Sequence, residues 1–411
     1  MVDCFSAPEL VPLESAMEQL LGLVQKTQQT QTIDLEQALG RILAKDQISN
    51  LNIPPADNSA MDGYAFKFAD GHEGTTLKMV AKVFAGHPIS QTIQAGECVR
   101  IMTGGQIPAG CDAVSMQENV SANGNSITIN QTVQKGENIR RQGEDISEGQ
   151  SVLKCGQRLT ASHIGLLASL GNQNICVHKK LTVALISTGD ELKKPGQTLS
   201  PGQFFESNTY SVKAMLKRLD MNVLDFGIIP DNLEQLSKTF ADADAQADIV
   251  ISSGGVSVGE ADYTKTVLDK LGEIQFWKLA IKPGKPFAFG LLPNSYFFGL
   301  PGNPVSAMVT MHQLATPLLR KIAGEHARVP LRLQAKTSEK IRKRPGRTDF
   351  QRGVYSIDES GQLQVRPNGA QGSGILSSMS AANCYIVLEQ QQGNVDVGEQ
   401  VLIEPFDEVL R

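Results

Sequence analysis

The sequence has no cluster of cysteines or histidines of the kind that binds a metal ion. The six cysteines are scattered without a CxxC pair, and the six histidines form no HxxxH or HExxH arrangement. Such spacing fits neither a zinc site nor a disulfide framework, and it is typical of incidental thiols in a reducing compartment. A histidine-ligated metal is therefore not expected, and the cysteine pattern favours the cytoplasm.

Aromatic residues are also few, with a single tryptophan, and no excess of basic residues accompanies them. The formal net charge of -5 and the pI near 5.8 lack the basic footprint of a nucleic-acid-binding protein. No apolar run approaches the ~20 residues that span a bilayer. The stretch MVDCFSAPELVPLE has acidic residues and no continuous apolar segment, unlike a secretory signal. Binding of this protein to nucleic acid or to a membrane is therefore not expected.

A length of 411 residues is too great for one ordinary domain. Residues 12–45 have helical spacing, with a second short helix predicted from Asp34, and residues 149–178 become helical again, with Gly171 as a C-cap. Between them the chain is β-rich, and Asn123-Gly124 predicts a hairpin. This order predicts a discontinuous linking domain (5–48 with 149–178) that carries a β-rich inserted domain (49–148).

The second half of the chain changes character twice. Residues 179–328 alternate strand and helix patterns with short links, which predicts a doubly wound α/β domain with a mainly parallel sheet. Residues 329–411 return to short alternating strands, which favour a small C-terminal β-barrel or sandwich. The expected fold class is therefore multidomain α/β plus β.

Three Gly-rich turns follow strand-like runs between residues 248 and 306: SSGGVSVGE, KPGKP and LPGNP. Glycines at the carboxyl ends of strands let backbone N–H groups approach an anion. Lys278, Lys282 and Lys285 would complement phosphate charge, and Glu260 and Asp262 are possible metal ligands. The alternative is that the glycines serve only the tight turns. SGGVSVGE matches neither the dinucleotide fingerprint nor the P-loop.

Acidic residues follow other strands of the same domain, namely Asp190, Glu191 and Asp231. Hard oxygen ligands of this kind suit Mg²⁺, although Asp190 and Asp231 could equally cap helices. In the β-rich block, the loops DNSAMDGYA and NIRRQGEDIS each place an acid beside glycine, and solvated turn chemistry explains them as well. Nothing in the spacing joins the two groups of acids. No Ser/His/Asp arrangement or cysteine nucleophile is indicated.

Seven ordered motifs carry a resemblance to a known family: DNSAMDGYA, RIMTGG, NIRRQGEDIS, STGDEL, SSGGVSVGEADYTK, FWKLAIKPGKPFAFG and GLPGNPVSA. Together they resemble the MoeA-type molybdopterin molybdenumtransferases, whose fold is also that of the gephyrin E domain. The resemblance covers nearly the whole chain. It implies an enzyme of molybdenum cofactor biosynthesis that takes molybdate and adenylylated molybdopterin, inserts molybdenum into the dithiolene, and releases AMP with Mg²⁺.

The resemblance also implies roles for individual residues. The catalytic acids would be Asp62, Asp145, Glu191, Asp231 and Asp262, of which Glu191, Asp231 and Asp262 would hold the metal. Lys278 and Lys282 would hold the phosphate of the pterin or the molybdate. The remaining binding residues would be Thr103 and Arg140 in the opposing wall, Ser252, Gly254 and Gly255 on the pterin side, and Pro301 and Pro304 in the last turn.

Assembly and partners follow from the same resemblance. It implies an elongated homodimer whose cleft combines the α/β domain of one subunit with the β-rich domain of the other. Transient contacts with the molybdopterin adenylyltransferase and with apo-molybdoenzymes or their chaperones are expected.

Two other functions compete with this one. The α/β block alone resembles the molybdopterin adenylyltransferases, although their turn reads GGTG and this chain has Gly254-Gly255-Val256-Ser257. A non-catalytic molybdopterin-binding scaffold on the same fold is the second alternative. The sequence does not distinguish molybdate from tungstate, because the two oxyanions are almost alike in size and charge.

Overall fold

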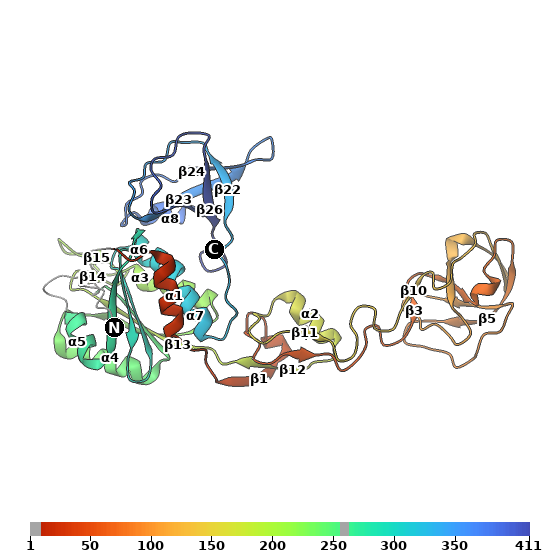
Figure 1. Cartoon of the computed structure of the whole chain (residues 1–411). Coiled ribbons are helices and arrows are strands. Elements are labelled where there is room, and N and C mark those ends of the chain that lie inside the picture. The colour runs from red at the N-terminus through yellow and green to blue at the C-terminus, as the bar shows by residue number, and fades with distance from the viewer. Residues whose placement is uncertain (1–9, 255–262) are drawn as a thin grey trace.

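The computed structural model of this protein describes residues 10–254 and 263–411. The molecule is elongated (Figure 1), with an α/β unit and a β-barrel at one end and a β-rich unit at the far end. A slender linking unit lies between them. The predicted fold class, α/β with additional β domains, is confirmed. In the described part of the chain, no helix has both the length and the apolar character that a membrane crossing requires.

The linking unit is built from short elements that pair across long sequence distances. They are β1 (Thr30–Asp34), η1 (Leu35–Gln37), β2 (Gln47–Ile48), β11 (Ser151–Leu153), α2 (Ala161–Ser169) and β12 (Asn174–His178). Strand β1 pairs with β12, and β2 pairs with β11. The chain therefore leaves for the β-rich unit and returns from it through two paired strands. Gly171 ends α2 with a φ of 75°, as predicted.

The helical interpretation of residues 12–45 was too broad. Helix α1 (Leu13–Leu23) ends before the strand TQTID, in which β-branched residues alternate in a way that suits a strand. The helix predicted from Asp34 is a single 3₁₀ turn, and no side-chain cap bond forms at Asp34. Although α1 lies in the range assigned to the linking domain, its buried residues pack into the core of the α/β unit.

The β-rich unit holds a six-stranded sheet and two small helices. Its elements are β3 (Asn58–Ser59), β4 (Gly63–Phe66), η2 (Phe68–Asp70), β5 (Thr76–Val83), β6 (Glu97–Ile101), β7 (Ala113–Met116), η3 (Gln117–Asn119), β8 (Val120–Asn123), β9 (Ser126–Ile129) and β10 (Ile139–Arg140). The sheet order is β7-β4-β6-β5-β9-β8. The hairpin predicted at Asn123-Gly124 joins β8 to β9. Gly124 has a φ of 59°, which glycine adopts without strain.

The α/β unit has a six-stranded sheet in the order β16-β13-β17-β21-β20-β18. Its elements are β13 (Thr182–Thr188), β14 (Leu192–Lys193), β15 (Phe204–Phe205), α3 (Asn208–Arg218), β16 (Asn222–Ile229), α4 (Leu233–Gln246), β17 (Ile249–Ser253), α5 (Tyr263–Leu271), β18 (Glu273–Lys278), β19 (Ile281–Lys282), β20 (Pro286–Leu291), β21 (Tyr296–Leu300), α6 (Pro304–Thr310), the π-helix η4 (Met311–Ala315) and α7 (Thr316–Ile322). The four strands β16, β13, β17 and β21 are parallel, and β20 pairs antiparallel with both β21 and β18.

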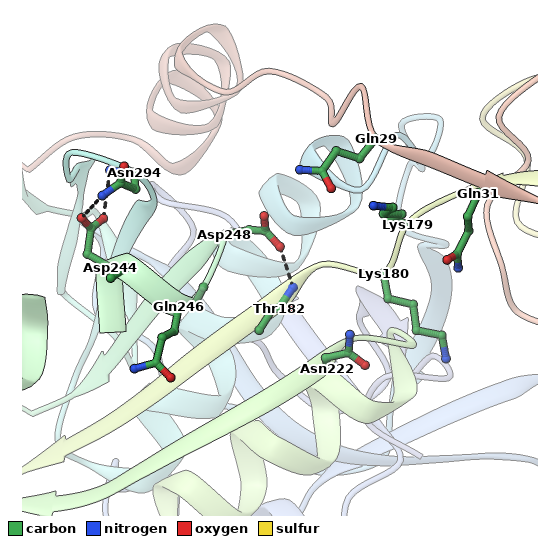
Figure 2. A pocket seen from close by; sticks show the side chains of 12 residues that line it. Gln29, Gln31, Lys179, Lys180, Thr182, Asn222, Asp244, Gln246, Asp248 and Asn294 are labelled. Atoms are coloured by element: carbon green, nitrogen blue, oxygen red, sulfur yellow. Dashed lines mark hydrogen bonds between the residues drawn. The ribbon is translucent and has the colours of Figure 1, made fainter. Parts of the chain in front are cut away.

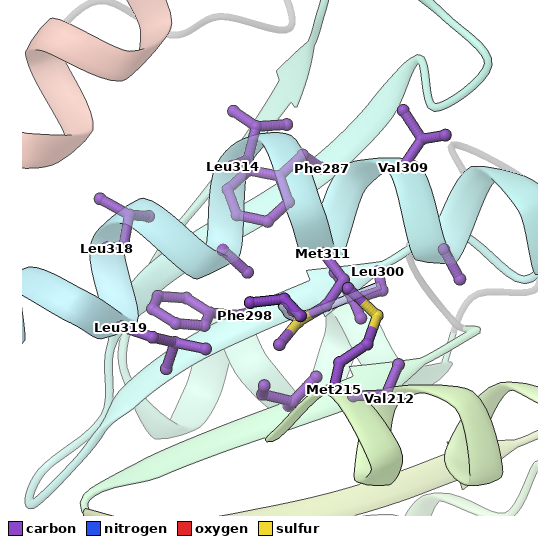
Figure 3. Packing of buried hydrophobic residues seen from close by; sticks show 14 of the residues in the cluster. Val212, Met215, Phe287, Phe298, Leu300, Val309, Met311, Leu314, Leu318 and Leu319 are labelled. Atoms are coloured by element: carbon purple, nitrogen blue, oxygen red, sulfur yellow. The ribbon is translucent and has the colours of Figure 1, made fainter. Parts of the chain in front are cut away.

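Two apolar cores cover the two faces of this sheet. Helices α1, α3, α6 and α7 bury one face, where Phe287 and Phe298 pack beneath Leu314 and Leu318 (Figure 3). Helices α4 and α5 bury the other face, with Phe240 against Phe297. Because both faces are covered, the parallel strands have nearly continuous apolar sequences, as in DIVISS.

The C-terminal unit is a closed barrel. Its elements are β22 (Leu333–Thr337), β23 (Thr348–Ile357), β24 (Leu363–Pro367), α8 (Leu376–Ser380), β25 (Cys384–Leu388) and β26 (Gln400–Pro405). Pairing of β23 with both β24 and β25 closes the ring through β22 and β26. Strand β19 of the α/β unit extends the barrel sheet by pairing with β23, so the two units share a hydrogen-bonded contact.

Candidate functional site

The carboxyl ends of the parallel strands form the rim on which the Gly-rich turns lie. Gly254 follows β17 with a φ of 90°, and a Cβ there would lie 2.8 Å from the carbonyl oxygen of Thr188. Only glycine fits this close approach. The Asn208 amide donates to Ser253 Oγ at 2.7 Å and to the Gly302 carbonyl at 2.8 Å. These bonds fix the start of α3 against two of the predicted turns.

Three carboxylates gather at the ends of β13 and β16. The backbone N–H of Asp231 donates to Asp190 Oδ1 at 3.1 Å. Burial raises the pKa of the Asp231 carboxyl, and the negative charges of Asp190 and Glu191 raise it further. The sequence placed these acids on separate turns, and the structure brings them together.

The carboxylate oxygens of this cluster are the donor type that a hard divalent cation prefers. Mg²⁺ is bound through one or two carboxylates, retains waters and bridges to substrate phosphates. The mutual repulsion felt by Asp231 is what a bound cation would relieve. Within the described residues, no group of three or more acids, histidines or cysteines is arranged so that it could hold a metal ion without a further ligand from elsewhere. Of the predicted metal ligands, Glu191 and Asp231 lie at this cluster, whereas Asp262 lies outside the described residues, as does the predicted binding residue Gly255.

We call the rim at the carboxyl ends of the parallel strands the crevice. The remaining residues predicted for it lie at the ends of these strands, as expected. Ser252 is fully buried in β17, and its hydroxyl has no hydrogen-bond partner among the described residues. Pro301 is buried directly after β21, and Pro304 opens α6 at its first turn. Asn303 precedes that helix without a side-chain cap bond, so the proline in the first turn is the local signal for the helix start.

The predicted anion-binding lysines lie at the ends of two strands of the α/β unit. Lys278 ends β18, and Lys282 ends β19 beside the barrel strand β23. The Lys282 ammonium lies 3.1 Å from Asp349, whose side chain is only 4% exposed, while Lys282 itself remains 42% exposed. Lys282 therefore balances a buried carboxylate and still presents its charge to solvent. Sequence reasoning did not anticipate Asp349, because nothing in the spacing joins it to KPGKP.

Arg352 is a second charged residue that sequence reasoning left out. Its side chain is fully buried and donates to Ser378 Oγ at 3.1 Å and to the Gly372 carbonyl at 3.2 Å. Burial lowers the pKa of its guanidinium, which nonetheless stays charged at neutral pH. The adjacent loop touches the last turn of the crevice, since Val305 N–H donates to the Ser373 carbonyl. The only feature of the sequence that could have drawn attention to Arg352 is a charged residue within a strand pattern.

The polar loops of the β-rich unit also converge. Strand β10, which contains the exposed Arg140, pairs with β3 in the DNSAMDGYA loop. Asp62 accepts hydrogen bonds from the N–H and the hydroxyl of Thr103, both at 2.7 Å. The N–H bond is the main reason that the pKa of Asp62 lies below its ordinary value. Asp145 is exposed, and its N–H donates to the Ile53 carbonyl in the neighbouring segment.

These loops do not reach the crevice of the same chain. Figure 1 places β3 and β10 at one end of the molecule and the α/β sheet at the other, with the linking unit between them. The predicted residues therefore form two groups. Glu191, Asp231, Ser252, Gly254 and the lysines belong to one group, and Asp62, Thr103, Arg140 and Asp145 belong to the other.

A pocket of about 580 Å³ lies elsewhere. It opens at the amino ends of the parallel strands, beside Lys179 and Lys180 (Figure 2). Its carboxylates hold the fold together, because Asp248 accepts from the Thr182 N–H and Asp244 accepts from Asn294. In α/β sheets ligands bind at the opposite, carboxyl edge. We therefore do not assign the chemistry to this pocket.

Comparisons with known proteins cover almost the whole chain. Residues 11–171 match the MoeA N-terminal region (domain I and II), residues 184–321 match a probable molybdopterin binding domain, and residues 334–406 match the MoeA C-terminal region (domain IV). A molybdopterin molybdenumtransferase of Haemophilus influenzae is 47% identical, over 98% of this chain and 100% of that protein. One from a Nostoc species is 34% identical, over 93% and 90% respectively.

A solved structure agrees with these matches. The crystal structure of the molybdopterin biosynthesis moeA protein from Pyrococcus horikoshii superposes with a TM-score of 0.84, at 28% identity, over 97% of this chain and 100% of that one. Sequence and structure therefore agree from the linking unit to the barrel, and the chain belongs to the MoeA family, whose matched relatives are molybdopterin molybdenumtransferases.

Proposed function

We propose that this protein is a molybdopterin molybdenumtransferase that inserts molybdenum from molybdate into adenylylated molybdopterin, with Mg²⁺-dependent release of AMP. The single observation that carries the proposal is the carboxylate cluster of Asp190, Glu191 and Asp231 at the carboxyl edge of a molybdopterin-binding type of sheet. The full-length similarity to molybdenumtransferases supports the same reaction.

Each side chain in the crevice has a task that its surroundings support. Glu191 and Asp231 would hold Mg²⁺, which when bound supplies positive charge to the phosphate oxygens of the substrate. Lys278 and Lys282 compensate the charge of phosphate or molybdate oxygens. Cleavage of the phosphoanhydride needs little covalent chemistry from the protein, so positioning and charge compensation are the main contributions of these residues.

The second group of residues would contribute to the cleft of the partner subunit. Asp62 is held as an anion by Thr103, and the exposed Arg140 pairs with Asn58 of the same loop, but these loops lie far from the crevice of their own chain. In a homodimer of antiparallel elongated subunits, each β-rich unit would face the crevice of the partner. Two-fold symmetry would then form two identical clefts.

The cellular setting belongs to the same proposal. The enzyme would work in the cytoplasm, take its substrate from the molybdopterin adenylyltransferase, and pass its product to apo-molybdoenzymes or their chaperones. A non-catalytic scaffold would need neither the carboxylate cluster nor the held Asp62.

The decisive experiment measures AMP release from adenylylated molybdopterin with Mg²⁺, with and without molybdate, and without ATP. Molybdate-dependent AMP, together with reconstitution of an apo-molybdoenzyme, is the expected result. A requirement for ATP would identify an adenylyltransferase instead. Tight pterin binding without any AMP would identify a scaffold.

A further inference from the structure

A second, smaller cavity lies beside the outer edge of the α/β sheet. It has a volume of about 260 Å³ and is lined by Lys194, Glu206, Thr209, Tyr210 and the β16 residues 225–228. Pockets that hold a whole drug-sized ligand are typically ~300–1,000 Å³. This one is the size for a single ring system.

A β-bulge in the edge strand opens the cavity. Leu185 pairs with Asp225 and Ser187 pairs with Ile228, so two residues of β16 lie opposite Ile186 alone. One of them is Gly227, whose φ of 80° belongs to the left-handed region. A Cβ at Gly227 would lie 3.8 Å from the Lys194 Nζ atom. Bulges of this kind recur next to functional sites, where they redirect side chains.

Glu206 is the feature that points to a ligand. The residue is only 5% exposed, yet it lines the cavity. Its Oε1 atom accepts from the Thr209 N–H at 2.7 Å and from the Ser187 hydroxyl at 3.2 Å. Its Oε2 atom has no donor among the described residues. A carboxylate offers about four acceptor positions, so half of the capacity of Glu206 is unused.

The other acid of the cavity differs in this respect. Asp225 Oδ2 accepts from Lys213 at 3.3 Å, and Asp225 Oδ1 accepts from the Gly227 N–H at 3.0 Å. Both of its oxygen atoms are therefore engaged within the protein. Asp225 serves as an internal comparison for Glu206.

Aromatic and cationic groups complete the cavity. The Tyr210 side chain lines it and is 57% exposed, whereas Phe226, which also borders it, packs its side chain against the core on the other face of the sheet. Lys194 supplies an ammonium group above the bulge. A flat heterocycle that carries N–H donors and a nearby anionic group fits these three kinds of contact.

We propose that this cavity holds the pterin ring of the substrate and that Glu206 is the residue that recognises it. The pyrimidinone edge of a pterin presents an amino group next to a ring N–H, which a carboxylate oxygen can accept. Adenine presents an acceptor nitrogen beside its amino group, which repels a carboxylate. Glu206 therefore selects the pterin rather than the adenine end of the adenylylated substrate.

The cavity lies close to the carboxylate cluster along the chain. Ile228 precedes Asp231 by three residues, and Lys194 follows Glu191 by three. Strand β16 runs from the cavity residues 225–228 to its end at Ile229, two residues before Asp231, so the phosphate-bearing side chain of a ring bound here would extend toward the proposed Mg²⁺ ligands. This inference rests on the proposed function, and it adds the orientation of the substrate.

The test compares two fluorescent or calorimetric titrations of the full-length protein, one with 6-hydroxymethylpterin and one with AMP. Glu206→Gln keeps the acceptor for Thr209 and Ser187 but presents an amide N–H₂ to the cavity. The Kd for the pterin is expected to rise roughly tenfold or more. The Kd for AMP should not rise, because glutamine pairs well with adenine. Asp225→Asn is the matched control and should leave the pterin Kd unchanged.

An unchanged pterin Kd in a folded Glu206→Gln variant would overturn the proposal, and so would an equal weakening in Asp225→Asn. If Glu206→Gln does not fold, Tyr210→Leu replaces an exposed ring and should still weaken the pterin several-fold; unchanged binding there rejects the cavity. AMP release by the wild type separates the two proposals. Normal release with an unaltered KM in Glu206→Gln rejects the pterin site alone, whereas pterin binding without any release rejects the proposed reaction alone.

Discussion

Asp231 in the α/β crevice and Asp62 in the β-rich loops are the same functional group in opposite surroundings. Asp231 is crowded by Asp190 and Glu191, and its pKa is raised by burial and by those charges. Asp62 accepts two hydrogen bonds from Thr103, and its pKa is lowered. Among the described residues, no cation lies against the Asp231 carboxylate, while the Asp62 carboxylate is held by two hydrogen bonds.

This difference separates two kinds of acidic residue in one proposed cleft. A cluster of repelling carboxylates favours a cation, because the cation removes the repulsion. A carboxylate held by an N–H and a hydroxyl has a fixed orientation and a permanent charge, which suits the positioning of a substrate or a water. We expect Asp231 to act through Mg²⁺ and Asp62 to act directly.

The largest effect is expected from removing either acid. Asp231→Ala and Asp62→Ala should each lower the rate of AMP release by roughly a hundredfold or more, because each removes charge or orientation needed at the reacting phosphate. The measurement is AMP release with Mg²⁺ and molybdate. Glu234→Ala, in the first turn of α4, is the control for Asp231 and should retain activity. Near-normal turnover in either aspartate variant would contradict the role of that residue.

A mixing experiment sharpens the comparison between the two regions. If each cleft combines Asp231 of one subunit with Asp62 of the other, a mixed dimer of the two inactive variants contains one intact cleft. Random exchange of subunits should then restore about a quarter of the wild-type activity. Activity is measured after co-refolding or co-expression. No recovery, with mixed dimers demonstrated by tagged subunits, would place both residues in one chain's own site.

The Lys282 pair tests how much of the crevice is structural. Lys282→Ala removes the ammonium group that lies 3.1 Å from the buried Asp349, so it should lower the free energy of unfolding by about 1–2 kcal/mol as well as weaken anion binding. Replacement of a fully solvated lysine would lower the free energy of unfolding by less. Denaturant unfolding measures the first effect, and Lys285→Ala, an exposed lysine of the same loop, is the control. Stability equal to the wild type would show that Asp349 does not depend on Lys282.

The smallest effect is an opposite pH dependence of stability in the two regions. Asp231 has a raised pKa, so its contribution is greatest below the ordinary value of about 3.9 and is lost as the pH rises through the raised pKa. Asp62 has a lowered pKa, so its contribution is present above about 3.9 and is lost as the pH falls.

Thermal unfolding of Asp231→Asn and Asp62→Asn without Mg²⁺, from neutral to acidic pH, measures this contrast. Asp231→Asn should be more stable to heat than the wild type at neutral pH, and this difference in stability should shrink on acidification. Asp62→Asn should be the less stable protein at neutral pH, and its deficit should shrink. Parallel curves would mean that the two carboxylates do not differ as described.

Much of the fold could be predicted because it depends on local patterns. The hairpin at Asn123-Gly124, the end of α2 at Gly171 and the start of α6 at Pro304 each follow from the conformational limits of one or two residues. The helix predicted over residues 12–45 failed at β1, since Thr30–Asp34 pairs with a strand more than a hundred residues away. The local sequence does not reveal which distant strand will pair with a segment.

The site divides in the same way. The sequence by itself determined which residues are candidates for the chemistry, because glycines, acids and lysines at strand ends have few other uses in combination. Only the tertiary structure decided which of them meet. It joined Asp231 to Asp190, Thr103 to Asp62 and Lys282 to Asp349, and it separated the two groups along the molecule. Electrostatic coupling depends on distance, and the distance between residues remote in sequence is set by how the sheets pack.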